Sequence, residues 1–336
     1  MPQRDILAAT ILADPCWLPH AYNPARAALG LLRVPRERLS QPAFLADLAR
    51  ETGHDSAELP LAGLGPLAPP AETPVTFIFH TAFCRLTLLV RALEQPGIST
   101  GLSEPGIIAS LAGAGAAGQA ALAPVAALLG RPWGAGEAVF IKPTNHANRL
   151  APGLMQALPQ ARAVLMTNPL PSFLAAVVRK GMMGRRWGRQ LYLELISYAG
   201  MDLGMDGREQ FAMTDLQATA LAWFLNQRFL AALASNFGAR VRVLDGDAFA
   251  RDPAATLAAV YAFAGKPVTP AQIAAIASGP VFARDAKTGE DFAAKSARDN
   301  AATSSAVTED EIAKVSEWIG LIAQQAGLSV PLAQTL

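Results

Sequence analysis

Apolar residues along this chain form short continuous runs, separated by segments with helical spacing. The four runs that read as buried strands are VTFIF (75–79), EAVFIKP (137–143), ARAVLMTNP (161–169) and RVRVLDGD (240–247). Strands that are apolar throughout and separated by helices are typical of a parallel sheet covered on both faces. The pattern therefore predicts an α/β fold in three layers, with the sheet in the middle.

Helical spacing marks the segments between these runs. The predicted helices cover residues 87–95, 149–159, 170–181 and 211–238, and Gly181 stands where a C-cap is expected. Residues 106–130 are uncharged, but Gln119 and Pro124 interrupt them and large apolar side chains are few. Membrane insertion rewards Leu, Ile, Phe and Val, so two packed helices joined by a loop are expected there, and no membrane span.

The last predicted helix, 308–328, is amphipathic. Thr308 and Glu311 have the spacing of a capping box. Apolar residues fall on one face of this helix, namely Ile312, Val315, Ile319 and Ile322. We expect this face to pack on the core, which makes the helix a structural element.

Residues 1–72 lack this alternation of apolar runs and helical segments. They read as an irregular, partly helical leader that ends in the proline- and glycine-rich stretch PLAGLGPLAPPAETP. Such a composition marks a linker or a wrapping segment. The sequence therefore predicts an N-terminal wrapping segment, 1–72, followed by one α/β domain, 73–336.

The composition narrows the classes of partner. The 336-residue chain is 51% hydrophobic and carries a net charge of only +1, so neither nucleic acid nor a strongly acidic surface is expected as a partner. Cys16 and Cys84 are far apart and form neither a metal-binding spacing nor a disulfide framework. The first residues do not read as a secretory signal. A reduced, cytoplasmic setting is expected.

The segment HTAFCRLT, 80–87, connects the first predicted strand to a helix. Unpaired N–H groups at a helix start attract anions, and ligands collect at the carboxyl ends of parallel strands. The corner is therefore a candidate phosphate site. The Walker pattern G-x-x-x-x-G-K-[ST] is absent and the corner has no glycine, so an ordinary turn is the alternative.

Three segments together resemble sulfotransferases that use 3′-phosphoadenylyl sulfate (PAPS). VFIKPTNHANRLAPGLMQALPQARAVLMTNPLPSFLAAVVRKG is similar to the middle of such enzymes, and HTAFCRLTLLVRAL…LSEP to the opening of a bacterial sulfotransferase-like branch. VRVLDGDAFARDPAATLAAVYAFAG resembles a later signature, whose matching positions are Asp245, Asp247, Asp252, Pro253 and Gly265. The resemblance covers about residues 75–290. It implies a parallel-sheet P-loop, sulfotransferase-like, three-layer fold with helical insertions.

The resemblance also implies donor-binding residues, with clear departures from the family pattern. The implied phosphate loop comprises Phe83, Cys84, Arg85, Leu86 and Thr87. The family's loop has a Lys or Arg followed by Ser-Gly-Thr-Thr, whereas here the glycine is replaced by Arg85 and only Thr87 keeps a hydroxyl. Arg85 either supplies the lost positive charge as a guanidinium fork or fills the site with its bulk.

Basic residues elsewhere are candidates for holding the rest of the donor. Thr167 and Ala175 stand where the family has an Arg and a phosphate-binding Ser. The nearby basic residues that could replace them are Arg179, Lys180, Arg185, Arg186 and Arg189, although a solvated basic face explains them equally well. The stretch FARDAKTGEDF resembles the loop that closes over the donor's 3′-phosphate, and there Arg284 and Lys287 are the implied contacts.

Candidate catalytic residues lie within two of these motifs, VFIKPTNH and LSEP. Lys142 stands where the family has a sulfate-contacting lysine, although a lysine at a strand end also snorkels to water. His146 and Glu104 are alternative general bases for the acceptor hydroxyl. His80 reads as a structural, hydrogen-bonded residue, and Cys84 as loop packing.

These residues predict transfer of a sulfuryl group from PAPS to a hydroxyl of a small molecule, with no metal required. Two alternatives stay open, a non-catalytic protein of this fold that has lost donor binding and a P-loop small-molecule kinase. The expected partner is the small-molecule acceptor, whose identity the sequence does not encode. The oligomeric state stays open, with a homodimer as one option.

Overall fold

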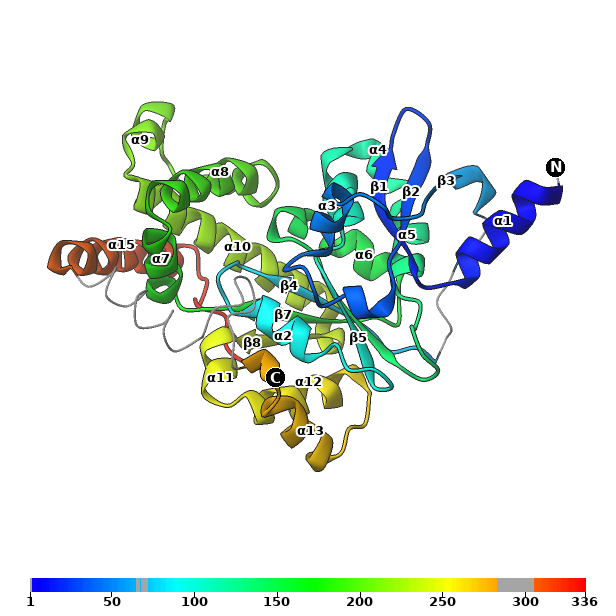
Figure 1. The fold of residues 1–336 in the computed structure, drawn as a ribbon. Coiled ribbons are helices and arrows are strands. Elements are labelled where there is room, and N and C mark those ends of the chain that lie inside the picture. Colours follow the sequence, from blue (N-terminus) through cyan, green and yellow to red (C-terminus); the bar gives the residue numbers. More distant parts are fainter. Residues whose placement is uncertain (1, 65–66, 68–71, 283–304) are drawn as a thin grey trace.

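The computed structural model describes residues 2–64, 67, 72–282 and 305–336 (Figure 1). Its centre is a parallel five-stranded sheet of order β5-β6-β4-β7-β8. The strands are β4 (Val75–His80), β5 (Ser99–Ser103), β6 (Ala138–Lys142), β7 (Arg162–Thr167) and β8 (Val241–Asp245). The predicted α/β fold with a parallel sheet is confirmed.

Alternate residues of the central strands point to opposite faces of the sheet, because the side-chain period of a strand is two. Phe77 and Phe79 join one apolar cluster, and Ile78 joins another. The first face is covered by α3 (Gly106–Gly113), α5 (Leu122–Leu129), α6 (Ala151–Ala157) and the end of α10 (Asp215–Phe237). The second is covered by α2 (Leu86–Ala92), α11 (Gly246–Arg251), α12 (Pro253–Ala264) and α13 (Pro270–Ala277). Both faces are buried, which explains the continuous apolar runs.

A lobe of long helices projects from one end of the sheet (Figure 1). It comprises α7 (Leu170–Arg179), α8 (Gly181–Ala199), α9 (Gly207–Ala212), the start of α10 and α15 (Ala306–Gln325). Helices α8 and α10 approach closely at Gly188, where an added Cβ would lie 1.9 Å from Thr219 Oγ1. Gly181 has φ +59° just after α7, as its expected place at the helix end requires.

Helix α15 confirms the predicted apolar face but not the predicted start. Val315 and Ile319 are buried in the lobe, with Ile312 and Ile322 packed beside them. The capping box at Thr308 is wrong, because the helix begins at Ala306 and the Ser305 hydroxyl accepts the Thr308 N–H.

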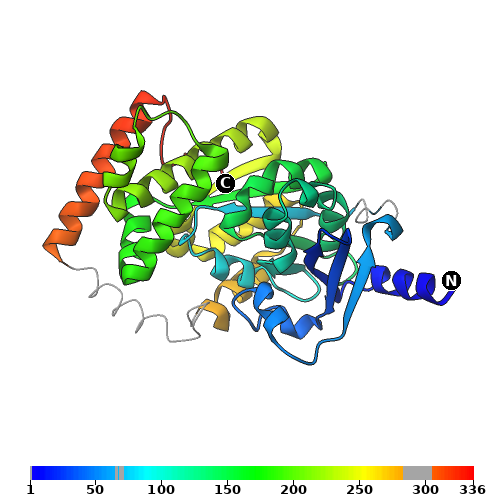
Figure 2. The same cartoon turned by 90° about the horizontal axis from the view of Figure 1, so that it is seen from above.

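The N-terminal segment contains an antiparallel sheet that the apolar pattern missed. Its elements are α1 (Pro2–Ala13), β1 (Trp17–Asn23), β2 (Ala28–Arg33), β3 (Ser56–Pro60) and the short 3-10 helices η1 (Arg36–Arg38), η2 (Leu45–Arg50) and η3 (Leu61–Gly63). Pro19 and His20 break the apolar run in β1, and the pairing register shifts between Pro19 and Ala21. Figure 2 places α1 (blue) and α15 (orange) at opposite ends of the molecule.

Strand β5 was also missed, because STGLS has few large apolar residues. Its Gly101 lies under α2, where an added Cβ would be 2.3 Å from the Val90 carbonyl oxygen. The remaining short elements are α4 (Ala116–Gln119), η4 (Asn145–Leu150), η5 (Gly238–Arg240) and η6 (Pro280–Phe282). Residues 106–130 form α3, α4 and α5, close to the expected helix pair. Within the described ranges, no helix is both long enough and apolar enough to cross a membrane.

Candidate functional site

The strand order creates a crevice at the carboxyl edge of the sheet. From β4 the chain crosses to β5 on one side, whereas from β7 it crosses to β8 on the other, and β4 and β7 are neighbours. In open α/β sheets, ligands bind where neighbouring connections diverge in this way. Residues 81–87, which form the loop after β4 and the start of α2 and include the predicted phosphate-loop residues, leave the sheet at this point.

The loop after β4 adopts an unusual backbone. Ala82, Phe83 and Arg85 have φ values of 73°, 53° and 63°, although none is glycine. Left-handed conformations cost such residues roughly 1–2 kcal/mol each. His80 helps to hold the loop, since its Nδ1 accepts the Ala82 N–H at 3.1 Å and its Nε2 contacts the Pro143 carbonyl at 3.2 Å. Those bonds bear out the structural interpretation of His80.

The loop also lies against the residue that follows β8. Gly246, which follows β8, lies so close that an added Cβ would be 2.5 Å from the Cys84 carbonyl oxygen. The side chains of Cys84, Leu86 and Thr87 are 2%, 4% and 5% exposed and therefore face the core. Of the five predicted loop residues, only Phe83 and Arg85 present their side chains to the crevice.

A cleft of about 270 Å³ opens at this crevice. The loop after β4, the residue after β7 together with α7, and the start of α11 supply its lining, which consists of Phe83, Arg85, Asn168, Ser172, Ala175, Arg179 and Asp247. Arg85 Nε lies 4.0 Å from Asp247 Oδ1, and the Ser172 hydroxyl donates to Asp247 Oδ2 at 3.1 Å. The cleft thus contains two guanidinium groups, and the Asp247 carboxylate lies close to that of Arg85.

Asn168 ties the loops after β4 and β7 together. Its Oδ1 accepts the Thr81 hydroxyl at 3.1 Å, and its carbonyl accepts the Trp223 indole N–H at 3.0 Å. Asn168 is itself only 3% exposed. The first bond joins the two loops, and the second anchors Asn168 to α10.

Lys142 and Glu104 lie at the ends of neighbouring strands and form an ion pair. Their side chains are 2% and 19% exposed. The Lys142 ammonium also lies 4.9 Å from the centre of the Phe44 ring, and the Glu104 carbonyl accepts the Ala46 N–H at 3.1 Å. The N-terminal segment therefore covers this half of the strand edge, and two of the predicted catalytic side chains neutralise each other there.

His146 begins the next turn after β6, in η4. Its Nδ1 lies 2.6 Å from Glu194 Oε2, and the Trp187 indole N–H donates to its Nε2 at 3.2 Å. The hydrogen bond to Glu194 raises the pKa of His146 above its usual 6.5, against the opposing effect of partial burial. Trp187 also packs edge-on against Phe83, with ring centres 5.0 Å apart, so His146 is linked to the cleft through one aromatic side chain.

The remaining predicted basic residues are scattered. Arg179 lines the cleft, whereas Lys180 is exposed at the end of α7. Arg185 pairs with Glu311 at 3.4 Å, Arg189 pairs with Asp215 at 3.2 Å, and Arg186 is exposed. Arg284 and Lys287 lie outside the described residues. Within the part of the chain that the structure describes, no group of three or more His, Cys, Asp and Glu could hold a metal ion.

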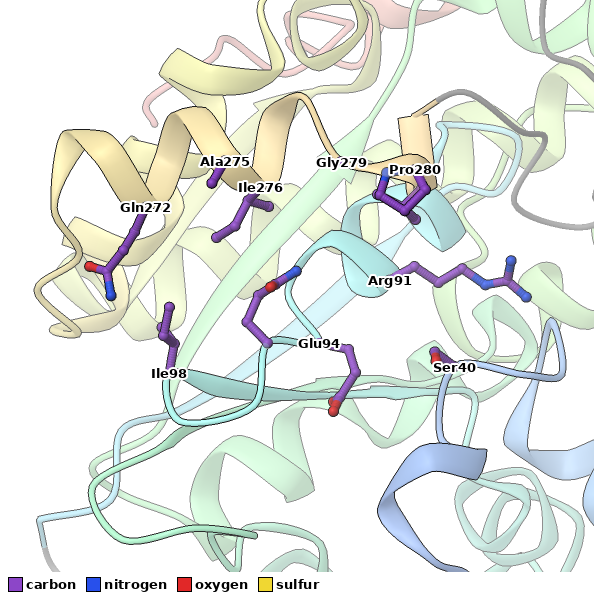
Figure 3. A pocket seen from close by; sticks show the side chains of 11 residues that line it. Ser40, Arg91, Glu94, Ile98, Gln272, Ala275, Ile276, Gly279 and Pro280 are labelled. Carbon is purple, nitrogen blue, oxygen red and sulfur yellow. The ribbon is translucent and has the colours of Figure 1, made fainter.

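A larger cavity, about 670 Å³, lies between α2, α13 and the N-terminal segment (Figure 3). Arg91, Glu94 and Gln272 contribute polar groups to it, and Ile98 and Ile276 contribute apolar ones. The sequence-predicted site residues do not line it. It is separate from the crevice at the carboxyl ends of β4 and β7.

Sequence reasoning missed four residues that shape the site. Asn168 and Ser172 lie in the MTNPLPS stretch, within the second motif, and their polar side chains after an apolar strand were an available signal. Trp187 and Glu194 had no such signal. They lie on α8, more than 40 positions after His146, and only the packing of α8 against η4 brings them to it.

Comparison with known proteins leaves the family of this chain unassigned. No family model matches it, and no curated protein matches its sequence. A solved structure that is similar, a sulfotransferase domain from the curacin biosynthetic pathway, has 12% sequence identity and a TM-score of 0.43. The similarity covers 77% of this chain and 99% of that one. What the fold and the cleft define is an α/β protein with a candidate ligand site at the carboxyl edge of a parallel sheet.

Proposed function

We propose that this protein transfers a sulfuryl group from PAPS to a hydroxyl group of a small molecule. The observation that carries the proposal is the cleft at the diverging connections of β4 and β7, into which Arg85 and Arg179 bring guanidinium groups. Guanidinium forks suit the paired oxygens of phosphate and sulfate groups. The motif order along the sequence supports PAPS over other anionic donors.

Sulfuryl transfer needs no covalent bond between the protein and the transferred group. The acceptor oxygen attacks the sulfur in line while negative charge builds on the leaving phosphate oxygen, so positioning and positive charge supply most of the catalysis. In this proposal Arg85 and Arg179 hold the donor's phosphates and His146 accepts the hydroxyl proton. Lys142 would stabilise the leaving group only after Glu104 releases it, and Arg284 and Lys287 are proposed as further donor contacts.

Isothermal titration with 3′-phosphoadenosine 5′-phosphate, the product of the donor, tests the proposal. We expect micromolar binding that Arg85→Ala and Arg179→Ala each weaken tenfold or more, about 1.4 kcal/mol. Arg251→Ala is the matched control, because Arg251 lies on α11 outside the cleft lining and its side chain is 70% exposed. Equal losses in all three variants, or no binding by the wild type, would sink the donor site.

One observation favours a second candidate, a protein of this fold that binds ligands without transferring a group. Lys142 is 2% exposed and is held by Glu104 under the Phe44 ring. A parallel titration with ATP tests the other alternative, a P-loop small-molecule kinase. Tight ATP binding without bisphosphate binding would favour the kinase. Binding of neither nucleotide would favour the non-catalytic protein.

We place this activity in the cytoplasm, as the composition indicated. Cys16 and Cys84 form no disulfide, Cys84 being buried and Cys16 half-buried. Reducing compartments keep cysteines out of disulfides. Thiol titration of the protein purified from its native cells, showing two reduced cysteines, would agree with this setting, and a mixed disulfide at Cys16 would not.

A further inference from the structure

His146, Glu194 and Trp187 form a chain of hydrogen bonds drawn from two separate elements. His146 lies in η4, directly after β6, and the other two residues lie on α8, one on each side of the imidazole. The Nδ1–Oε2 distance to Glu194 is 2.6 Å and the Nε2–Nε1 distance to Trp187 is 3.2 Å. Both ring nitrogens of His146 are therefore occupied at once.

The partners decide which nitrogen carries the proton. An indole N–H can only donate, so His146 Nε2 accepts and holds no proton. The ring's proton then lies on Nδ1, where it is donated to the Glu194 carboxylate. This is the tautomer in which a carboxylate-oriented histidine offers Nε2 as a base.

We propose that Glu194 is the positioning residue that keeps His146 in this tautomer, and that the Trp187 N–H occupies the Nε2 lone pair until an acceptor hydroxyl takes its place. The base role rests on the proposed function, whereas the tautomer and its dependence on Glu194 do not. Trp187 touches Phe83, a wall of the cleft, with ring centres 5.0 Å apart. The occupied lone pair is thus linked to the cleft through the side chains of Trp187 and Phe83.

The proton balance of the step is complete. The acceptor O–H donates to His146 Nε2, its oxygen forms the new S–O bond, and the bond from sulfur to the donor's phosphate oxygen breaks with its electron pair on that oxygen. The proton stays on Nε2 as an imidazolium that faces Glu194, and water removes it after the products leave. No oxidant, reductant or metal is needed for the balance.

The carboxylates near His146 raise its pKa. Glu194 on α8 and Glu104 after β5 both favour the imidazolium and raise the pKa of His146, whereas partial burial lowers it. Glu104 is itself paired with Lys142. Arg149, on the same 3-10 helix, and Tyr198, on α8, also lie near Glu194. Because an imidazolium cannot accept at Nε2, protonation of His146 must break the Trp187 bond.

Nuclear magnetic resonance of the ¹⁵N-labelled full chain tests this without any acceptor. The imidazole nitrogens of His146, assigned by their loss in His146→Gln, should report the Nδ1–H tautomer above a midpoint higher than the usual 6.5. The Trp187 indole signal, assigned by Trp187→Phe, should titrate with the same midpoint. In Glu194→Gln the midpoint should fall by about one pH unit or more, since a carboxylate beside the ring is lost.

Glu209→Gln is the matched control, because Glu209 is an exposed helix-capping residue of α9 in the same lobe. It should leave the midpoint and the tautomer unchanged. An Nε2–H tautomer in the wild type, or a midpoint unmoved in Glu194→Gln, would overturn the positioning role. A third outcome is that the variants keep their folded spectra and the wild type does not bind 3′-phosphoadenosine 5′-phosphate. The proposed function, and with it the role of His146 as a base, would then be wrong, whereas the tautomer and its dependence on Glu194 would stand.

Discussion

Two arginine–carboxylate clusters lie at opposite edges of the central sheet, and they are built differently. At the amino edge, Arg36 Nη1 donates to both Glu137 oxygens at 2.7 and 2.6 Å, and its Nε donates to Glu94 at 3.0 Å. At the carboxyl edge, Arg85 Nε approaches Asp247 at 4.0 Å. One cluster is closed by short bidentate bonds, whereas the other leaves its guanidinium with bonding capacity for a ligand.

Burial sharpens the difference. The Arg36, Glu94 and Glu137 side chains are 21%, 8% and 2% exposed, and Glu137 also accepts the Gly97 N–H and the Thr100 hydroxyl. The Arg85 and Asp247 side chains are 40% and 32% exposed. A buried charge must have its partners within the protein, whereas a half-exposed one can exchange water for a ligand. The first cluster is therefore structural, and the second fits a binding site.

Breaking the closed cluster should have the largest effect. Arg36→Met leaves the buried Glu94 and Glu137 carboxylates side by side without their cation, and losing one partner of a buried pair costs about 3–5 kcal/mol. We expect a loss of this size in the free energy of unfolding, measured by urea denaturation. In Arg26→Met, which breaks an ion pair whose side chains are 69% and 39% exposed, the loss should stay below about 0.5 kcal/mol. Similar losses in both variants would refute the distinction.

Distorting the open cluster's loop should have a smaller effect on stability but a clear one on binding. Gly246→Ala places a Cβ where the Cys84 carbonyl oxygen lies at 2.5 Å, so the loop that carries Arg85 must move. Such overpacking costs about 1–3 kcal/mol of stability, and we expect binding of 3′-phosphoadenosine 5′-phosphate to weaken at least tenfold in calorimetry. Gly320→Ala, with open space around it in α15, should instead be neutral or stabilising. Unchanged nucleotide binding in Gly246→Ala would argue against the loop's role.

Removing the Asp247 carboxylate, which competes for Arg85, should have the smallest effect. Unlike the two preceding changes, it should strengthen a property, namely bisphosphate binding. Asp247→Asn keeps the acceptor for Ser172 but frees Arg85 from a negative charge 4.0 Å away. We expect bisphosphate affinity to rise by up to about tenfold at low salt and by less at high salt, because half-exposed charges are screened. Asp252→Asn removes the same charge from the nearby cap of α12, where Asn caps equally well. A rise that the control matches would mean a general charge effect.

The apolar pattern located most of the sheet but not all of it. β4, β6, β7 and β8 are long apolar runs because both of their faces are buried. β5 is equally buried, yet α2 packs so closely on Gly101 that a side chain there would clash, and Ser99 and Thr100 are small polar residues. The hydroxyl of Ser99 donates to the Leu93 carbonyl, and that of Thr100 donates to Glu137. The antiparallel sheet of the leader was missed for a different reason, since Pro19 and His20 interrupt the apolar run of β1 and its pairing register shifts there. A run of large apolar residues in the sequence indicates a strand that is buried by its side chains. A strand that is buried by close backbone contact has small residues and lacks such a run.

For the candidate site, too, the sequence indicated some features and not others. The motifs named Arg85, Arg179 and Asp247, which do line one cleft, and Lys142, His146 and Glu104, which lie along the same edge of the sheet. That gathering follows from strand direction, because residues just after parallel strands meet at one edge. The roles of these residues as donor and acceptor contacts stay predictions. Their pairings were not readable, since Lys142 with Glu104 and Arg85 with Asp247 depend on strand order.

By itself, then, the sequence determined the parallel α/β architecture, the edge at which its polar residues gather and the apolar face of the last helix, because these follow from periodicity and local turns. The tertiary structure alone decided which charges are satisfied and which stay open to a ligand. Glu194 and Trp187 reach His146 only because α8 packs beside η4, and Asp247 reaches Arg85 only because β8 is placed two strands from β4. The pKa of an ionisable group and its capacity to bind depend on neighbours in space, and those neighbours lie tens to more than a hundred residues away in the chain.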